Sequence, residues 1–280
     1  MPRPKNSYVV LVLSFCSLVV LPVFARPASA PASPGQKAPA ASPASTPDAL
    51  ALVEKIGERI ASYPKLDSWR AKALSTSSRM TSEWKPKSTT VSEKIVTVDA
   101  GLWSEEILSA TETEGGKTRD VTKEAQKEAQ ERAAKQKRSP EKEGKEDKKS
   151  GGRGSLDMTR EELLPFGPDK RSGYDFTIEG QRDLNGAPAI LVRSRSRVRS
   201  DEKFEGLYFV DPATHDVRRA ELTMAKRPAP LKRMEMEFDF QVLPEGYQVM
   251  KRSLVRIHVG VIVKNVRVEA LETYSDYVVR

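Results

Sequence analysis

The sequence predicts a mainly β domain of the α+β class, built on an antiparallel sheet. Three observations lead to this prediction. Much of the 280-residue chain divides into short segments in which apolar and polar residues alternate. The breaks between these segments carry turn residues. The connections are too short to hold the crossover helices that parallel strands require.

One amphipathic helix is expected before the first strand. Thr46 can cap its N-terminus, with Pro47 in the first turn and Pro64 at its end. Apolar residues then recur at three- and four-residue steps, which gives the helix one apolar face. These residues are Ala49, Leu52, Val53, Ile56, Ile60 and Tyr63.

Strands are expected on both sides of a charged central region, and residues 205–280 form one unbroken meander. Turn residues at Asn185-Gly186, 211–214, 228–230 and 244–246 separate the later strands. The segment 103–110 fits either a strand or a helix. The expected strands are 69–77, 91–98, 174–182, 189–199, 206–210, 217–224, 232–243, 247–258 and 261–270.

The segment 232–242 has the clearest strand pattern. Met234, Met236, Phe238, Phe240 and Val242 take every second position, so they share one face of the sheet. This face is either core, packed against the helix, or the wall of a binding site. Methionine and phenylalanine suit both, because they also adapt to irregular apolar ligands.

The N-terminal region is expected to be an export signal followed by a linker. Arg3 and Lys5 precede an apolar run from Tyr8 to Phe24, and Val23-Phe24-Ala25 resembles a signal peptidase site. We therefore expect a signal peptide at 1–25 and a periplasmic protein, with an uncleaved inner-membrane anchor as the alternative. Residues 26–47 are rich in Ala, Pro and Ser, which favours an extended linker.

The rest, residues 48–280, is expected to form one domain with a charged insertion at 117–153. Within the insertion, 122–137 favours a solvated helix, and 139–154 is charged and glycine-rich. The insertion holds 13 basic and 8 acidic residues, and Arg3 and Lys5 add two positive charges. Of the net charge of +8, only about +1 remains for the rest of the chain. No nucleic-acid-binding surface is therefore expected.

No catalytic or metal-binding pattern is found. His215 and His258 are the only histidines, and Cys16, in the apolar run, is the only cysteine. A metal site needs several such ligands in close spacing, and a serine hydrolase of the common kind needs a Gly-x-Ser-x-Gly elbow. We expect no enzyme, no metal and no cofactor. The missing cysteines also exclude a disulfide framework, so stability must come from a core.

Four arginines alternate along one predicted strand. Arg193, Arg195, Arg197 and Arg199 would lie on one face at a period of two. Two interpretations remain open. The arginines pair with acidic residues of another strand, such as Glu235, Glu237 and Asp239. Alternatively, they form a strip for anionic head groups or an acidic partner.

The order of elements resembles the outer-membrane lipoprotein-sorting superfamily, which includes periplasmic lipoprotein carriers and receptors and the sensor domain of the sigma-E regulator. Local matches are Gly206-Leu-Tyr-Phe-Val-Asp-Pro-Ala-Thr214 with Val217-Arg-Arg-Ala-Glu221, and Glu272-Thr-Tyr-Ser-Asp-Tyr277. The resemblance covers about 48–115 and 155–280. It implies a curved, unclosed antiparallel half-barrel, with the N-terminal helix and short helices covering an apolar concave face.

The Met/Phe face of 234–242, together with the helix, leads us to expect a carrier that binds lipid or lipoprotein acyl chains, with the helix as a loosely docked partial lid. Membrane contact would be peripheral. The alternative is an envelope sensor or scaffold that binds another protein through the insertion or the arginine strip. For the apolar cavity, the expected residues are Leu52, Ile56, Ile60, Met234, Met236, Phe238 and Phe240.

Overall fold

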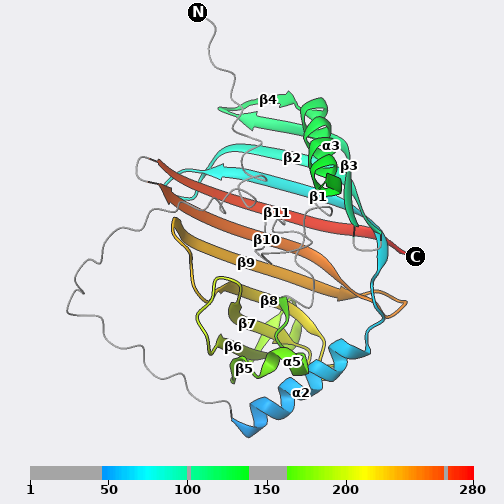
Figure 1. Ribbon diagram of the computed structural model, residues 1–280, viewed down its shortest axis with the longest axis vertical. Coiled ribbons are helices and arrows are strands. Elements are labelled where there is room, and N and C mark those ends of the chain that lie inside the picture. Colours follow the sequence, from blue (N-terminus) through cyan, green and yellow to red (C-terminus); the bar gives the residue numbers. More distant parts are fainter. Residues whose placement is uncertain (1–45, 100–101, 139–162, 262–263) are drawn as a thin grey trace, which may run out of the picture.

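A computed structural model describes residues 46–99, 102–138, 163–261 and 264–280 (Figure 1). The predicted signal peptide, nearly all of the linker and the glycine-rich segment 139–154 lie outside these residues. Among the described residues, no helix is both long and apolar enough to cross a membrane.

The described residues form one antiparallel sheet of eleven strands in the order β4-β3-β2-β1-β11-β10-β9-β8-β7-β6-β5. The prediction of a mainly β, unclosed antiparallel fold is confirmed. The first strand pairs with the last, for example Ser75 with Glu272. The strands are β1 (Ser68–Met80), β2 (Pro86–Asp99), β3 (Leu102–Glu114), β4 (Lys117–Asp120), β5 (Tyr174–Leu184), β6 (Ala187–Ser196), β7 (Phe204–Val210), β8 (Val217–Met224), β9 (Leu231–Val242), β10 (Gln248–Val261) and β11 (Lys264–Val279).

The sheet extends further than the sequence indicated. Residues expected to begin the insertion instead form the edge strand β4, which pairs with β3. Helix α3 (Thr122–Arg138) follows and also packs on β3, where the sequence suggested a solvated helix. Its contacts use alanines, Ala125 and Ala129, so no conventional apolar face marks them in the sequence. The ambiguous segment 103–110 is a strand.

Helix α2 (Pro47–Ser62) begins as expected. The Thr46 side chain accepts a hydrogen bond from the Ala49 backbone N–H at 3.3 Å. The face made by Ala49, Val53 and Ile56 is completely buried. Burying Val and Ile side chains contributes about 1.5–3 kcal/mol each. Docking of α2 is therefore much tighter than the loosely docked lid expected for a carrier with reversible binding.

The main core lies between α2 and strands β5 to β10. A segment missed by the sequence analysis, Leu163 to Phe166, inserts between the helix and the sheet. Phe166 packs against Phe176 and Tyr208, with ring centroids 5.7 and 4.8 Å apart. The short helix α5 (Pro168–Arg171) follows beside β5.

Candidate functional site

One face of the sheet carries both long helices. The Met236 and Phe238 positions of β9 are cross-strand partners of Val255 and Ser253 on β10. The same face continues through Glu272 and Tyr274 of β11 to Ala73 of β1, because these are partners in the ladder too. Helix α2 covers one end of this face and α3 the other. We call it the concave face, and its middle lies between the two helices (Figure 1).

The seven residues predicted for the cavity are brought together, and they lie at the α2 end of the concave face. Ile56, Met236, Phe238 and Phe240 are buried in the main core. Leu52, Ile60 and Met234 are partly buried and pack against it. The structure thus joins the helix and strand that the periodicities indicated. Their role in ligand binding stays a prediction.

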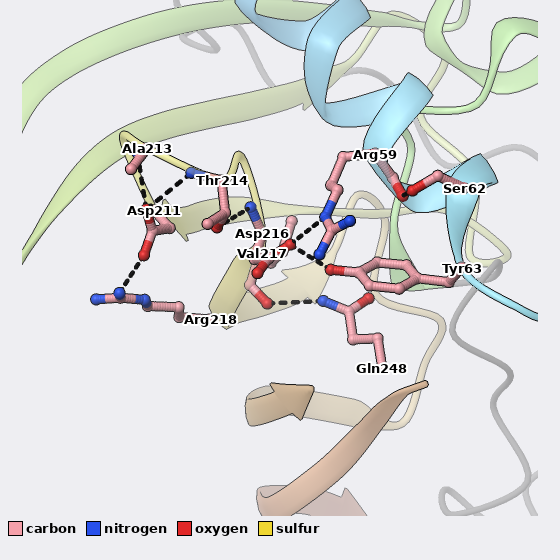
Figure 2. A network of polar contacts seen from close by, with 10 residues as sticks. All are labelled: Arg59, Ser62, Tyr63, Asp211, Ala213, Thr214, Asp216, Val217, Arg218 and Gln248. Carbon is pink, nitrogen blue, oxygen red and sulfur yellow. Dashed lines mark hydrogen bonds and ion pairs between the residues drawn. The ribbon is translucent and has the colours of Figure 1, made fainter. Parts of the chain in front are cut away.

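A polar network ties the end of α2 to the turn between β7 and β8 (Figure 2). Asp216 Oδ1 accepts hydrogen bonds from Arg59 Nε at 2.6 Å and from the Tyr63 hydroxyl. Asp211 organises the turn by accepting from the backbone N–H groups of Ala213 and Thr214 at 2.8 and 3.0 Å. The turn was predicted from its Asp-Pro-Ala-Thr sequence, but its attachment to the helix was not.

This network keeps Asp216 ionised. Burial opposes the charge, but the hydrogen bonds from Arg59 and Tyr63 outweigh it, so the pKa of Asp216 lies below its ordinary value. Burial and the neighbouring carboxylate raise the pKa of Tyr63, whose hydroxyl remains a donor. The network fixes the end of the helix to the turn.

The middle of the concave face holds a second apolar cluster. Ala71, Ala73, Val96 and Tyr274 form its buried floor. Larger side chains stand around them and are only partly buried: Trp69, Trp103, Met250 and Tyr277. Trp69 contacts Trp103 and Tyr277, with ring centroids 6.1 and 5.5 Å apart. Met250 also packs against the main core, so the two clusters are continuous.

A buried ionic cluster separates this middle region from α3. The Lys94 ammonium lies 2.6 Å from Glu272 Oε1 and also contacts Glu105. Arg132 of α3 reaches Glu105 at 2.9 Å, and the Tyr274 hydroxyl donates to Glu272 at 2.7 Å. Lys94 and Glu272 are 4% and 2% exposed, so each charge depends on its partner.

The charges in this cluster support each other. Burial lowers the pKa of Lys94, but Glu272 and Glu105 raise it more, so its net pKa is above the ordinary value. Burial raises the pKa of Glu105, but Lys94 and Arg132 lower it more. The sequence analysis missed this cluster. The available clue was that Lys94 shares its strand face with Val96 and Val98, which is unusual for a solvated lysine.

The arginine strip differs from its prediction. Strand β6 ends at Ser196, so Arg197 and Arg199 lie beyond it and the four arginines do not line one strand. Arg193 pairs with Glu179, and Arg197 pairs with Asp175 at 2.8 Å, both on the neighbouring strand β5. The acidic residues of β9 pair elsewhere: Glu235 with Arg233, and Glu237 and Asp239 with Arg219 and Arg252.

A hollow of about 810 Å³ lies at the strand ends near the β7–β8 turn. Its wall includes Phe240 and Tyr274, together with Arg219, Asp239, Arg252 and Thr273, which lie on the face of the sheet opposite to them. Volumes of this order are typical of small-molecule sites.

In the described part of the chain, no group of three or more metal-ligating side chains comes together. His215 is in the β7–β8 turn and His258 is on β10.

No family model matches the chain, and no curated protein matches it. Several solved structures are similar. A LolA superfamily protein from Nitrosomonas europaea is 12% identical, covering 83% of this chain and 93% of that one, with a TM-score of 0.36. A DUF1329 family protein from Desulfovibrio piger is 10% identical (82% and 93% covered, TM-score 0.38).

The complex of MucA and MucB from Pseudomonas aeruginosa is a third similar structure. It is 11% identical, covering 81% of this chain and 94% of that one, with a TM-score of 0.25. The first of these structures is named for the superfamily that the order of elements resembles. At such low identities and TM-scores the likeness carries no argument about function, and the proposals below are drawn from this chain's own residues.

Proposed function

We propose that this chain is a non-enzymatic periplasmic binding protein that receives the acyl chains of lipids or lipoproteins on its concave face. The observation that carries the proposal is the middle apolar cluster. Its side chains Trp69, Trp103, Met250 and Tyr277 are only partly buried, although the face on both sides of them is covered by a helix. Partly buried apolar side chains in a concave setting are typical of binding sites for apolar ligands.

The geometry suits a chain-like ligand. The middle cluster is continuous with the predicted cavity residues through Met250, and Met234, Leu52 and Ile60 are themselves only partly buried. Strand β9 has 12 residues, which at about 3.3 Å per residue matches an extended acyl chain in length. The acyl chain would lie across Trp69 and Met250.

Binding of this kind is passive. The apolar side chains replace water around the acyl chain and gain about 25 cal/mol for each Å² of apolar surface removed from water. No bond is made or broken, so no catalytic residue is required.

Lipid that co-purifies with the protein tests the proposal. We expect native mass spectrometry of protein from membrane-containing extracts to show bound lipid, and a fluorescent fatty acid to bind. Trp69→Ala should weaken binding of the fatty acid, because the Trp69 ring borders the middle cluster. Leu74→Ala is the matched control, since Leu74 lies on the opposite face and is 51% exposed. Absence of both lipid and fatty-acid binding would exclude the proposal.

A second candidate is a sensor or scaffold that binds another protein. Within the described residues, Arg195 and Arg199 form no ion pair, which leaves two charges of the predicted strip available. Because β4 and α3 belong to the fold, the test should remove only 139–154 or replace Arg195 and Arg199. Loss of a captured protein partner while fatty-acid binding stays intact would favour this second function.

A further inference from the structure

Positive charge is concentrated at one end of the sheet, although the chain outside the leader and insertion is almost neutral. The turns β1–β2 and β8–β9 lie at this end together with the end of β10 and the start of β11, on the left in Figure 1. Six cations of the described residues gather here, and we call them the basic end. They are Lys85, Lys226, Arg227, Lys232, Arg233 and Arg267.

Strand register places part of the basic end in one row. Arg233 on β9, His258 on β10 and Arg267 on β11 are successive cross-strand partners. They lie on the convex face, because the neighbouring Met234 and Ile257 pack into the core on the other side. Neighbouring strands are about 4.8 Å apart, so the two arginines, on either side of His258, lie about 10 Å from each other along the row.

Further cations extend the row into the adjoining turn. Lys232 lies over Gly260 of β10, where an added Cβ would come within 2.0 Å of its Cε. Its ammonium donates to Asn265 at 3.2 Å. Arg227 donates to the Lys232 backbone carbonyl at 2.6 Å. The Lys226 backbone N–H donates to Ser200 in the β6–β7 loop at 3.1 Å, so that loop adjoins the same end.

Two of the six cations form ion pairs, and the β6–β7 loop also brings the exposed carboxylates Asp201 and Glu202 to this end. Lys85 pairs with Glu83 and Arg233 with Glu235, both at exposed positions. Within the described residues, Lys226, Arg227, Lys232 and Arg267 form no ion pair. The positive charge of these side chains affects His258. Burial is the largest effect and lowers the pKa of His258, and the hydrogen bond with Asn265 opposes it. The nearby Arg267, Lys232 and Arg233 lower the pKa further.

An aromatic side chain stands at the same end. Trp84 is at the tip of the β1–β2 hairpin, and its backbone has a φ of +60°, which is unusual for a bulky residue. The Arg233 guanidinium lies 5.3 Å from the Trp84 ring centroid. Tryptophan prefers the boundary between lipid and water, where its ring is partly immersed and its N–H stays hydrated.

We infer that the basic end is a docking surface for the anionic head groups of a phospholipid bilayer. Lysines and arginines near an anionic membrane surface each add to binding, and the effect acts within about a Debye length. Four cations that form no ion pair among the described residues, beside an interfacial tryptophan, fit this surface better than an acidic protein, which would need matching carboxylates in register. This inference does not depend on acyl-chain binding, because none of its residues borders the concave face.

Vesicle flotation with the full chain tests the inference. Lys226→Glu/Arg227→Glu reverses two charges of the basic end. Lys65→Glu/Lys251→Glu makes the same change in net charge at exposed lysines of the opposite end. Residues 1–45 are identical in all proteins, so any contribution they make cancels. Vesicles of phosphatidylglycerol with phosphatidylcholine are compared with phosphatidylcholine alone.

We expect wild type and the Lys65/Lys251 variant to bind the anionic vesicles, with binding that weakens as salt rises. The Lys226/Arg227 variant should bind at least about tenfold less, and Trp84→Ala several-fold less. Equal losses in the two double variants, or equal binding to both kinds of vesicle, would overturn the inference. Fatty-acid binding measured on the same proteins keeps this result separate from the proposed acyl-chain site.

Discussion

The two helix-covered ends of the concave face are held in different ways. At the α2 end, Val53 and Ile56 are completely buried against phenylalanine and methionine side chains. At the α3 end, the helix contributes small alanines, and its register is fixed by polar contacts. Gln126 donates to the Ile107 carbonyl at 3.0 Å, and Arg132 pairs with Glu105.

The difference shows that helices can be positioned on one face of a sheet in two ways, by apolar burial and by charge pairing. Burial of apolar side chains that fit in shape contributes much stability, and the α2 end is a conventional core of this kind. Buried charges contribute little net stability but are costly to leave unpaired, so the α3 end is specified by complementary charge. Since α3 buries little apolar surface, it is the more weakly attached cover. The middle between the two ends, where Trp69, Trp103 and Met250 are only partly buried, is the proposed binding surface.

The largest expected effect comes from leaving buried charges unpaired at the α3 end. Lys94→Met removes the cation shared by Glu272 and Glu105, and should lower the free energy of unfolding by about 3–5 kcal/mol. Urea unfolding measures this. The matched control is Lys72→Met, because Lys72 pairs with Glu93 at 2.5 Å on the exposed convex face. Similar losses in both variants would mean that the Lys94 cluster does not specify this end.

A cavity at the α2 end should have the next largest effect. Ile56→Ala removes completely buried atoms and should cost about 2–5 kcal/mol of unfolding free energy. Leu50→Ala on the same helix is the control, because Leu50 is 50% exposed and should change stability by less than about 0.5 kcal/mol. If Ile56→Ala behaves like the control, α2 does not dock as described.

Acid should weaken both ends, each through one carboxylate. The folded-state pKa values of Glu105 and Asp216 lie below their ordinary values of 4.5 and 3.8. Each therefore contributes stability that is present above the ordinary value and is lost as the pH falls through the folded-state pKa. The urea concentration at the midpoint of unfolding should therefore fall as the pH is lowered from neutral to below those pKa values. Double replacement by Glu105→Gln and Asp216→Asn should flatten the fall, and an unchanged slope would contradict these pairings.

The smallest effect is expected for the exposed part of the α3 attachment. The Arg132 side chain is 39% exposed, so Arg132→Ala should cost no more than about 1 kcal/mol. Hydrogen exchange should nevertheless be faster in α3 and unchanged in α2. Uniformly faster exchange in both helices would show that the two ends do not open independently.

The sequence predicted those features that depend on local periodicity. Alternation at 234–242 located β9 and its apolar face, and the steps of three and four residues located α2. It could not predict contacts between distant segments. Asp216 gains its role only when the β7–β8 turn meets Arg59, and Lys94 is surrounded by residues from β3, β11 and α3. The α3 contact was missed because alanines at a helix surface give almost no apolar signal.

The measurement that tests the central claim most directly uses the three tryptophans of the chain. Trp69 and Trp103 border the middle of the concave face, whereas Trp84 lies at the hairpin tip on the other side. A Trp84→Phe variant should lose fluorescence when titrated with a brominated fatty acid, because bromine quenches indoles that it contacts. A Trp69→Phe/Trp103→Phe variant should not. No quenching in the first variant, or equal quenching in both, would contradict acyl-chain binding on the concave face.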